Sequence, residues 1–231
     1  MHLQPILDFV AKILGWLLGQ GSLLVGALVG ALGSLLATLY YERATRPSLE
    51  IIEDDNSPVE DHFKDRGWPP HKFLQIKVRQ KRGWWLFRTR RPAWATSATM
   101  TVHKQDGTRA ISKEIVARWS GAPEPLATES LGNQVIQVWD ISKLPLGQRF
   151  DIHANAEQQL AVAVKFEGER ECLIFSNESY SYNRWRKPEW RLDTGTYTVT
   201  LRVFYESGVA VRQFRLKNAG TSRNDFILEW D

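Results

Sequence analysis

The chain has 231 residues and a formal net charge of +4 at pH 7, with 30 Lys and Arg against 26 Asp and Glu. This mild basic excess suits an anionic membrane surface and is too small to predict a nucleic-acid-binding protein. Cys172 is the only cysteine, which excludes an intrachain disulfide and favours a reducing compartment.

The first 21 residues predict an amphipathic helix that lies in the membrane interface, with its helical part at residues 5–18. Apolar residues recur there at helical spacing and are Ile6, Val10, Ile13, Leu14 and Leu17. Such spacing gives a helix one apolar face, which an interfacial helix buries in the bilayer. Gly19-Gln20-Gly21 favours a break after this helix. One half of a re-entrant hairpin is the alternative that its length leaves open.

The stretch Ser22–Tyr41 carries no charge over 20 residues and predicts a transmembrane helix. At about 1.5 Å per residue it spans about 30 Å, the hydrocarbon thickness of a bilayer. Tyr40 and Tyr41 close the stretch with rings suited to the headgroup level, and Glu42 follows. Because no basic region precedes it, we expect a retained single-pass anchor in the cell membrane and not a cleaved signal peptide.

Small residues form a ridge along this helix. They recur at every fourth position and are Ser22, Gly26, Gly30, Ser34 and Thr38. Such a ridge lets two helix backbones approach closely, and packing then drives their association within the bilayer. We therefore expect a homo-oligomer formed through this face, or pairing with another membrane protein. Since glycine is common in membrane helices, a helix without a helical partner is the alternative.

Basic residues beside the helix set the expected topology. Arg43 and Arg46 follow it on the C-terminal side, against Lys12 and the amino terminus on the other side. Segments rich in Lys and Arg stay in the cytoplasm. We therefore expect the C-terminal domain to face the cytoplasm, and an extracytoplasmic domain is the alternative.

The rest of the chain, residues 48–231 after a linker at 42–47, predicts one all-β domain. Apolar and polar residues alternate there with the period of two that is typical of half-buried strands. The clearest expected strands are Leu49–Ile51, Leu74–Val78, Trp94–Val102, Val135–Trp139, Leu160–Phe166, Glu171–Phe175, Tyr197–Val203, Val209–Lys217 and Phe226–Trp230. The apolar phase slips between Val211 and Phe214, which suggests a β-bulge. About ten short strands separated by turns predict an immunoglobulin-like antiparallel β-sandwich.

Leu192, Gly195 and Tyr197 place a tyrosine at the start of the strand with the clearest alternation. This spacing resembles the tyrosine corner of immunoglobulin-like sandwiches, in which the hydroxyl bonds to the backbone a few residues upstream. We expect Tyr197 to fix the crossover between the two sheets. An ordinary strand tyrosine is the alternative, because tyrosine favours strands in general.

Several short motifs together resemble those of one group of proteins. They are Arg46-Pro-Ser-Leu-Glu-Ile51 after a membrane helix, a basic turn between two strands, Arg118-Trp-Ser-Gly-Ala-Pro-Glu-Pro125, Asn177-Glu-Ser-Tyr180 with Trp185, and the corner from Leu192 to Tyr197. The chain resembles uncharacterised prokaryotic membrane-anchored proteins with a C-terminal immunoglobulin-like β-sandwich. The resemblance implies a fold and an anchor but no known activity.

A basic and aromatic stretch, Lys77–Arg91, contains the turn between two expected strands. Its candidate docking residues are Lys81, Arg82, Trp84, Trp85, Phe87, Arg88, Arg90 and Arg91. Aromatic rings flanked by basic residues are typical of a loop that docks on anionic lipid, and they would also attract an acidic protein partner. The alternatives are an ordinary hairpin whose rings turn into the core and a site for single-stranded nucleic acid.

An acidic loop punctuated by prolines holds potential metal ligands. They are Asp54, Asp55, Glu60, Asp61, His62, Asp65 and His71. Their spacing matches neither an EF-hand nor a zinc signature. We therefore expect a solvated loop that binds no metal.

The sequence contains no common enzyme motif: no Gly-x-Ser-x-Gly, no phosphate-binding glycine-rich loop, no His-Glu-x-x-His and no paired cysteines. We therefore expect a non-catalytic binding or scaffolding module without a cofactor. The alternative is a membrane-tethered enzyme or ligand-sensing effector with a pocket in the sandwich. A concave site with perturbed carboxylates or histidines would favour that alternative.

Overall fold

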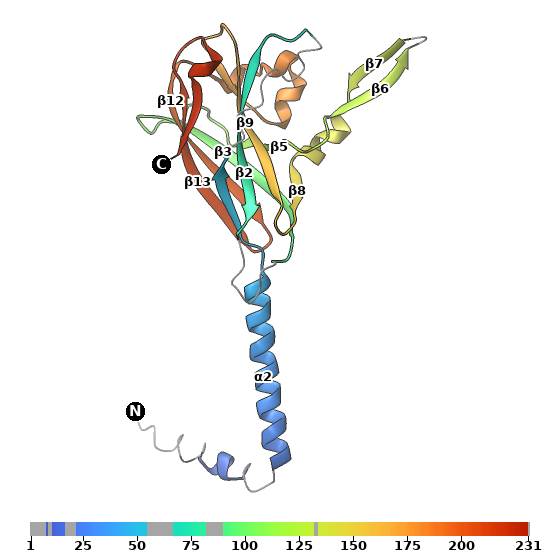
Figure 1. Cartoon of the computed structure of the whole chain (residues 1–231), viewed down its shortest axis with the longest axis vertical. Coiled ribbons are helices and arrows are strands. Elements are labelled where there is room, and N and C mark those ends of the chain that lie inside the picture. Colours follow the sequence, from blue (N-terminus) through green and yellow to red (C-terminus); the bar gives the residue numbers. More distant parts are fainter. Residues whose placement is uncertain are drawn as a thin grey trace. The chain divides into compact units, whose positions relative to one another are not determined.

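The computed structural model describes residues 8, 11–16, 22–54, 67–81, 90–131 and 134–230 (Figure 1). Side chains are described throughout these ranges except at residues 22–25, 131, 134, 135, 137 and 139. The chain forms two compact units, Met1–Arg46 and Pro47–Asp231.

The long helix of the first unit is α2 (Ser22–Thr45), with 24 residues. It continues through Thr45, into the range expected as a linker. Its described large apolar side chains, from Leu28 to Tyr41, are exposed. No charged residue of α2 precedes Glu42, so the helix has no polar face up to that point. Within the described residues, no helix has both the length and the apolar character of a membrane span.

Residues 11–16, within the expected interfacial helix, are also helical. Ile13, Leu14 and Trp16 are exposed there. Of the remaining positions in 5–18, only residue 8 is described.

The second unit, the β domain, contains fourteen strands in the described ranges, and all their pairings are antiparallel. Sheet A has the order β1 (Leu49–Glu53), β2 (His71–Gln80), β9 (Glu157–Phe166), β10 (Cys172–Ile174) and β11 (Arg191–Leu192), and β5 (Arg118–Trp119) also pairs with β9. Sheet B has the order β14 (Phe226–Trp230), β13 (Gly208–Asn218), β12 (Gly195–Tyr205), β3 (Ala93–Lys104) and β4 (Ile115–Val116), and β8 (Arg149–Ile152) also pairs with β3. A separate hairpin of β6 (Leu126–Leu131) and β7 (Gln134–Trp139) projects from these sheets (Figure 1).

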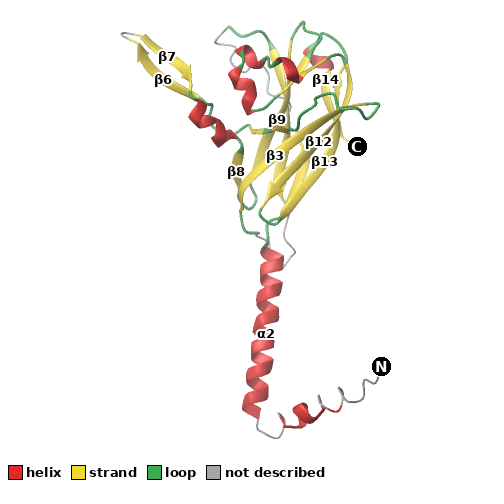
Figure 2. Cartoon of the chain, turned by 180° about the vertical axis from the view of Figure 1, so that it is seen from behind, coloured by secondary structure: helices red, strands yellow, loops and turns green. Residues whose placement is uncertain are grey.

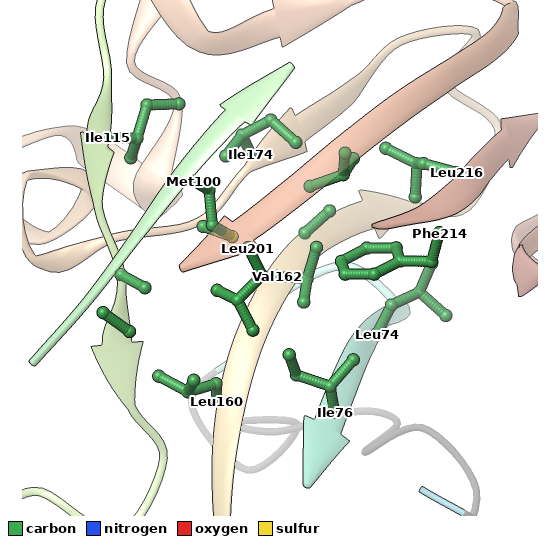
Figure 3. Packing of buried hydrophobic residues seen from close by; sticks show 14 of the residues in the cluster. Leu74, Ile76, Met100, Ile115, Leu160, Val162, Ile174, Leu201, Phe214 and Leu216 are labelled. Carbon is green, nitrogen blue, oxygen red and sulfur yellow. The ribbon is translucent and has the colours of Figure 1, made fainter. Parts of the chain in front are cut away.

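Sheets A and B pack face to face around the main core. Sheet A contributes Leu74, Ile76, Leu160, Val162 and Ile174 (Figure 3). Sheet B contributes Met100, Ile115, Leu201, Phe214 and Leu216 (Figure 3). Figure 2 shows its strands with the molecule turned by 180°. Each fully buried side chain of this size stabilises the fold by about 1.5–3 kcal/mol. The predicted all-β, sandwich-like fold is confirmed.

The bulge predicted in β13 is wrong. β13 pairs with β12 from Gly208 to Asn218 without a shift of register. Phe214 is buried, whereas Val209 and Val211 are 48% and 56% exposed. The apolar phase slips because two valines occupy the solvent face of a regular strand.

Regular alternation along this strand would place Trp94 on the same face as Thr96 and Ala98, which are buried, but Trp94 is exposed. The pairing of β3 with β8 shifts register between Ala93 and Thr96, both of which are buried. Ala95 lies between them with φ of 49°, and its N–H donates to Asp151 Oδ1 at 2.7 Å. This irregularity leaves Trp94 50% exposed.

A second apolar cluster covers the outer face of sheet A. Its buried members are Phe73, Ala161, Val164, Phe166, Leu173, Phe175 and Trp185. Trp185 belongs to a run of short 3₁₀ helices, η3 (Asn177–Ser181), η4 (Asn183–Trp185) and η5 (Pro188–Trp190). Its ring lies 5.0 Å from that of Phe73 and 5.6 Å from that of Phe175. The outer face of sheet A is therefore a packed layer and not a solvated one.

The chain crosses from sheet A to sheet B between β11 and β12. Tyr197, the second residue after Gly195, donates its hydroxyl to the carbonyl oxygen of Asp193 at 3.1 Å. Asn218 Nδ2 donates to the same oxygen at 3.0 Å. Two side-chain donors therefore hold the backbone of the crossover.

Replacing Tyr197 by phenylalanine removes one of these donors and keeps the ring. We expect Tyr197→Phe to lower the free energy of unfolding by about 1 kcal/mol, the usual net worth of such a hydrogen bond. Urea denaturation of the full chain in detergent, followed by tryptophan fluorescence, measures this. Tyr205→Phe is the matched control at the other end of β12, and an equal loss in both variants would contradict a special role for Tyr197.

Candidate functional site

Several segments meet at the end of the β domain where the chain enters it, which we call the linker end. Leu49, the first residue of β1, pairs with Gln80 at the end of β2. Ser207, in the turn between β12 and β13, donates its hydroxyl to the carbonyl oxygen of Pro47 at 2.7 Å. The first residues of the domain are therefore held against the end of β2 and the β12–β13 turn.

The basic loop predicted to dock on lipid starts and finishes at the linker end. Lys81 N–H donates to Ser48 O at 2.7 Å, and Arg90 Nε donates to Lys81 O at 3.1 Å. Gln80 Nε2 donates to Arg91 O at 2.8 Å. The structure therefore brings together Lys81, Arg90 and Arg91 of the predicted docking residues. The others, Arg82, Trp84, Trp85, Phe87 and Arg88, lie outside the described residues.

Exposed apolar side chains occur at the same end of the domain. Trp94, near the start of β3, is 50% exposed, and its ring meets that of His153 edge to face at 5.6 Å. Phe204 and Val209 face each other across the β12–β13 turn and are 37% and 48% exposed. Basic and apolar groups therefore share the linker end.

The acidic loop is described only at its two ends. Asp54 forms an ion pair with Lys77 at 2.9 Å and accepts a hydrogen bond from Gln159 at 2.7 Å. His71 is buried. The other predicted ligands fall in residues 55–66, outside the described part. Among the described residues, no group of three or more His, Cys, Asp or Glu could hold a metal ion.

The ridge of small residues lies on α2. Gly26 and Gly30 have open space where a side chain would start, and Thr38 donates its hydroxyl to Ser34 O at 2.8 Å. That bond satisfies the Thr38 hydroxyl within its own helix. The side chain of Ser22 lies outside the described residues.

A cavity lies on the outer face of sheet A, and no sequence pattern predicts it. It has a volume of about 380 Å³. Its lining residues come from β2, β5, β9 and η3 and are Phe73, Gln75, Arg118, Ser120, Gly121, Gln159, Ala161, Phe175 and Tyr180. The stretches Arg118–Pro125 and Asn177–Tyr180 are among the motifs that carry the family resemblance. Their contact in the folded domain depends on strand pairing over long sequence separations.

Arg118 is the charged group of this cavity. Arg118 is only 2% exposed, because β5 places it beside Ala161 on the covered face of sheet A. Its guanidinium donates to Asn177 Oδ1, and to the carbonyl oxygens of Ala122 at 3.2 Å and Pro123 at 2.6 Å. It also lies 4.7 Å from the ring centre of Tyr180. Arg118 is therefore held rigidly among neutral acceptors.

Gly147, at the end of the 3₁₀ helix η2 (Ile141–Gly147), makes room for this arginine. A Cβ atom at this position would lie 2.0 Å from Arg118 Nη1 and 2.5 Å from Asn177 Oδ1. Asn177 also donates to Leu144 O, which ties η2 to η3. Any larger residue at position 147 must therefore displace the guanidinium or its main partner.

A buried charged residue, Lys165, lies at the end of the domain opposite the linker end. Lys165 is fully buried, and its ammonium donates to Asn218 Oδ1 and to Gly220 O. Burial lowers the pKa of Lys165. Burial also raises the pKa of the nearby Cys172 thiol to about 12, so this thiol is neutral and poorly reactive at neutral pH.

Replacing Gly147 by alanine should disturb the Arg118 cluster. We expect Gly147→Ala to lower the free energy of unfolding by about 1–3 kcal/mol, the usual cost of overpacking a buried position. Urea denaturation of the full chain in detergent measures the change. The matched control is Gly121→Ala, because a Cβ there meets its nearest atom at an ordinary 3.5 Å. Equal effects of the two substitutions would contradict the close approach at Gly147.

No protein-family model and no curated protein matches the chain. Among solved structures, it is similar to one from a study of a family 123 glycoside hydrolase from Clostridium perfringens, with 8% sequence identity and a TM-score of 0.33. The similarity covers 76% of this chain and 28% of that chain. A likeness of this size assigns neither a fold family nor an activity.

Proposed function

We propose that this chain is a membrane-anchored, non-catalytic binding or scaffolding module. In this proposal α2 crosses the cell membrane, the β domain lies on the cytoplasmic side, and the linker end docks on anionic lipid or an acidic protein partner. The observation that carries the proposal is the gathering of basic and exposed apolar groups at the end of the domain nearest, along the chain, to the helix.

The sequence of α2 supports an anchor. Residues 22–41 carry no charge, and the described apolar side chains from Leu28 to Tyr41 are exposed to solvent. A helix that is apolar on all sides is unfavourable in water and suited to a membrane or to a partner that covers it. Lipid is the occupant that the length of the uncharged stretch favours.

The short connection supports docking through the linker end. α2 ends at Thr45 and β1 begins at Leu49. Three residues lie between them, and the four Cα–Cα steps from Thr45 to Leu49 reach at most about 14 Å, so an anchored helix keeps the linker end close to the headgroups. Tethering at this range raises the effective concentration of the lipid surface for the loop.

Electrostatics favours an anionic surface. Each basic residue near anionic lipid contributes about 1 kcal/mol. Lys81, Arg90 and Arg91 lie at the linker end, and the loop between them adds Arg82 and Arg88. Trp94, Phe204 and Val209 add apolar area of the kind that inserts at the headgroup boundary.

Two finer features belong to the same proposal. The crossover bond of Tyr197 to Asp193 supports an immunoglobulin-like sandwich, as does the packing of two antiparallel sheets. The open positions at Gly26 and Gly30 support association of α2 with a second copy or another membrane helix.

The cavity beside Arg118 favours the second candidate function, a ligand-sensing effector. Its described titratable lining groups are Arg118 and Tyr180, and burial raises the pKa of the Tyr180 hydroxyl. A membrane-tethered enzyme would require an acid, a base or a nucleophile within reach of this cavity. The lining favours binding over catalysis.

Removing the basic side chains at the linker end should weaken lipid binding. We expect the β domain, Pro47–Asp231, carrying Lys81→Ala, Arg90→Ala and Arg91→Ala to bind phosphatidylserine vesicles about a hundredfold more weakly than the unchanged domain, because about 1 kcal/mol is lost for each of the three charges. Vesicle co-sedimentation measures the binding, with phosphatidylcholine vesicles as the neutral surface.

The control variant carries the same change of charge at the opposite end of the domain. Lys104→Ala, Arg109→Ala and Arg170→Ala alter exposed residues at the far end of β3 and in the loops beyond the strands. This variant should bind as the unchanged domain does. Equal weakening in both triple variants would show a general charge effect and would contradict docking through the linker end.

A cysteine at an exposed position tests the topology. Cys172 is buried and should stay unlabelled in the folded protein, so it cannot report on the domain's location. Lys113→Cys introduces an exposed thiol. We expect a membrane-impermeant maleimide to label it only after the cells are permeabilised. Labelling in intact cells would place the domain outside the cytoplasm.

A further inference from the structure

The cavity on the outer face of sheet A has the size of a small-molecule site. Its volume of about 380 Å³ falls near the lower limit of ligand pockets, which run from about 300 to 1,000 Å³. Gly121 adds no side chain to its wall. The occupant that fits is therefore a small molecule and not a peptide or an extended chain.

One part of the wall is aromatic. The ring of Phe175 lies 4.9 Å from that of Phe73 and 5.7 Å from that of Tyr180, and both contacts are edge to face. Packing of this kind fixes the rings, so their orientation does not have to be ordered when a ligand binds. Aromatic rings in the lining suit a flat, apolar group.

The other part of the wall is polar and carries one positive charge. Gln75, Ser120 and Gln159 supply amide and hydroxyl groups, and Gln75 donates to Ser120 Oγ at 3.1 Å. Arg118 is the cation among the lining residues. Its guanidinium donates to the amide and carbonyl oxygens of Asn177, Ala122 and Pro123, and it also hydrogen-bonds the Tyr180 hydroxyl.

The oxygens that accept from the buried guanidinium of Arg118 in these bonds are neutral. Burying a charge is costly unless an opposite charge is supplied nearby. Glu124 lies close enough to influence the pKa of Tyr180, but the hydrogen bonds and ion pairs described for Arg118 do not include it. A ligand carboxylate at the cavity would give the guanidinium a negatively charged partner through charge-assisted hydrogen bonds.

We propose that this cavity binds a small monocarboxylate that carries a flat ring. The carboxylate pairs with Arg118, and the ring lies against Phe73 and Phe175. One lining cation balances one negative charge, so a monoanion is favoured over a phosphate dianion. The polar groups of Gln75, Ser120 and Gln159 suit a hydroxyl or amide substituent on the ring.

Benzoate and benzamide test this assignment, because they share a ring and a shape and differ in charge. Binding to the full chain in detergent is measured by the ligand-induced shift in melting temperature and by saturation-transfer NMR. We expect benzoate to bind about tenfold more tightly than benzamide, the ratio that corresponds to a charge-assisted bond. Equal binding of the two compounds, or binding of neither, would overturn the proposal.

Two variants locate the site. Arg118→Met removes the charge and should abolish the preference for benzoate, while Arg109→Met removes an exposed charge elsewhere and should leave the preference intact. Ser120→Leu alters an exposed rim residue, keeps Arg118 and should block both compounds, so the test stands even if Arg118→Met fails to fold. Unchanged benzoate binding in Ser120→Leu would place the benzoate elsewhere and overturn the proposal.

Discussion

The first residues of the β domain are fixed by hydrogen bonds, and the functional proposal depends on this attachment. Pro47 O accepts from the Ser207 hydroxyl, and Ser48 O accepts from the N–H of Lys81. These bonds hold the start of the domain against the β12–β13 turn and against the base of the basic loop. The two compact units adjoin in the chain, because Arg46 ends the first and Pro47 begins the second. Along the chain, the last residue of α2, Thr45, is therefore four positions before Leu49 at the linker end.

Much of the β domain was predictable from the sequence, because strands buried on one face keep the period of two. Leu160, Val162 and Val199 follow that rule, and all are fully buried. The rule does not extend to β5 and β11, which have two residues each and gain their place through partners on β9 and β10. It also misplaced Trp94, since a local shift of register reverses the side on which a side chain lies.

The candidate sites differ in how much the sequence could reveal. A basic and aromatic run is visible in one short stretch, and its two described ends lie where the chain enters the domain. The cavity is different, because Phe73, Arg118 and Tyr180 are brought together by long-range pairing and by the close approach at Gly147. Neither the composition nor the spacing of residues in the sequence predicts that these three side chains line one cavity. The packed layer on the outer face of sheet A, which creates the cavity, was equally absent from the period-two pattern.

The central claim is that the linker end of the β domain faces anionic lipid. Spin labels at Val209→Cys and Lys104→Cys, in the full chain reconstituted into phosphatidylserine-containing bilayers, test it most directly. Both positions are exposed, and they lie at opposite ends of sheet B. The account predicts that a water-soluble relaxation agent reaches the label at 209 much less than the label at 104. Equal accessibility at the two positions would contradict the claim.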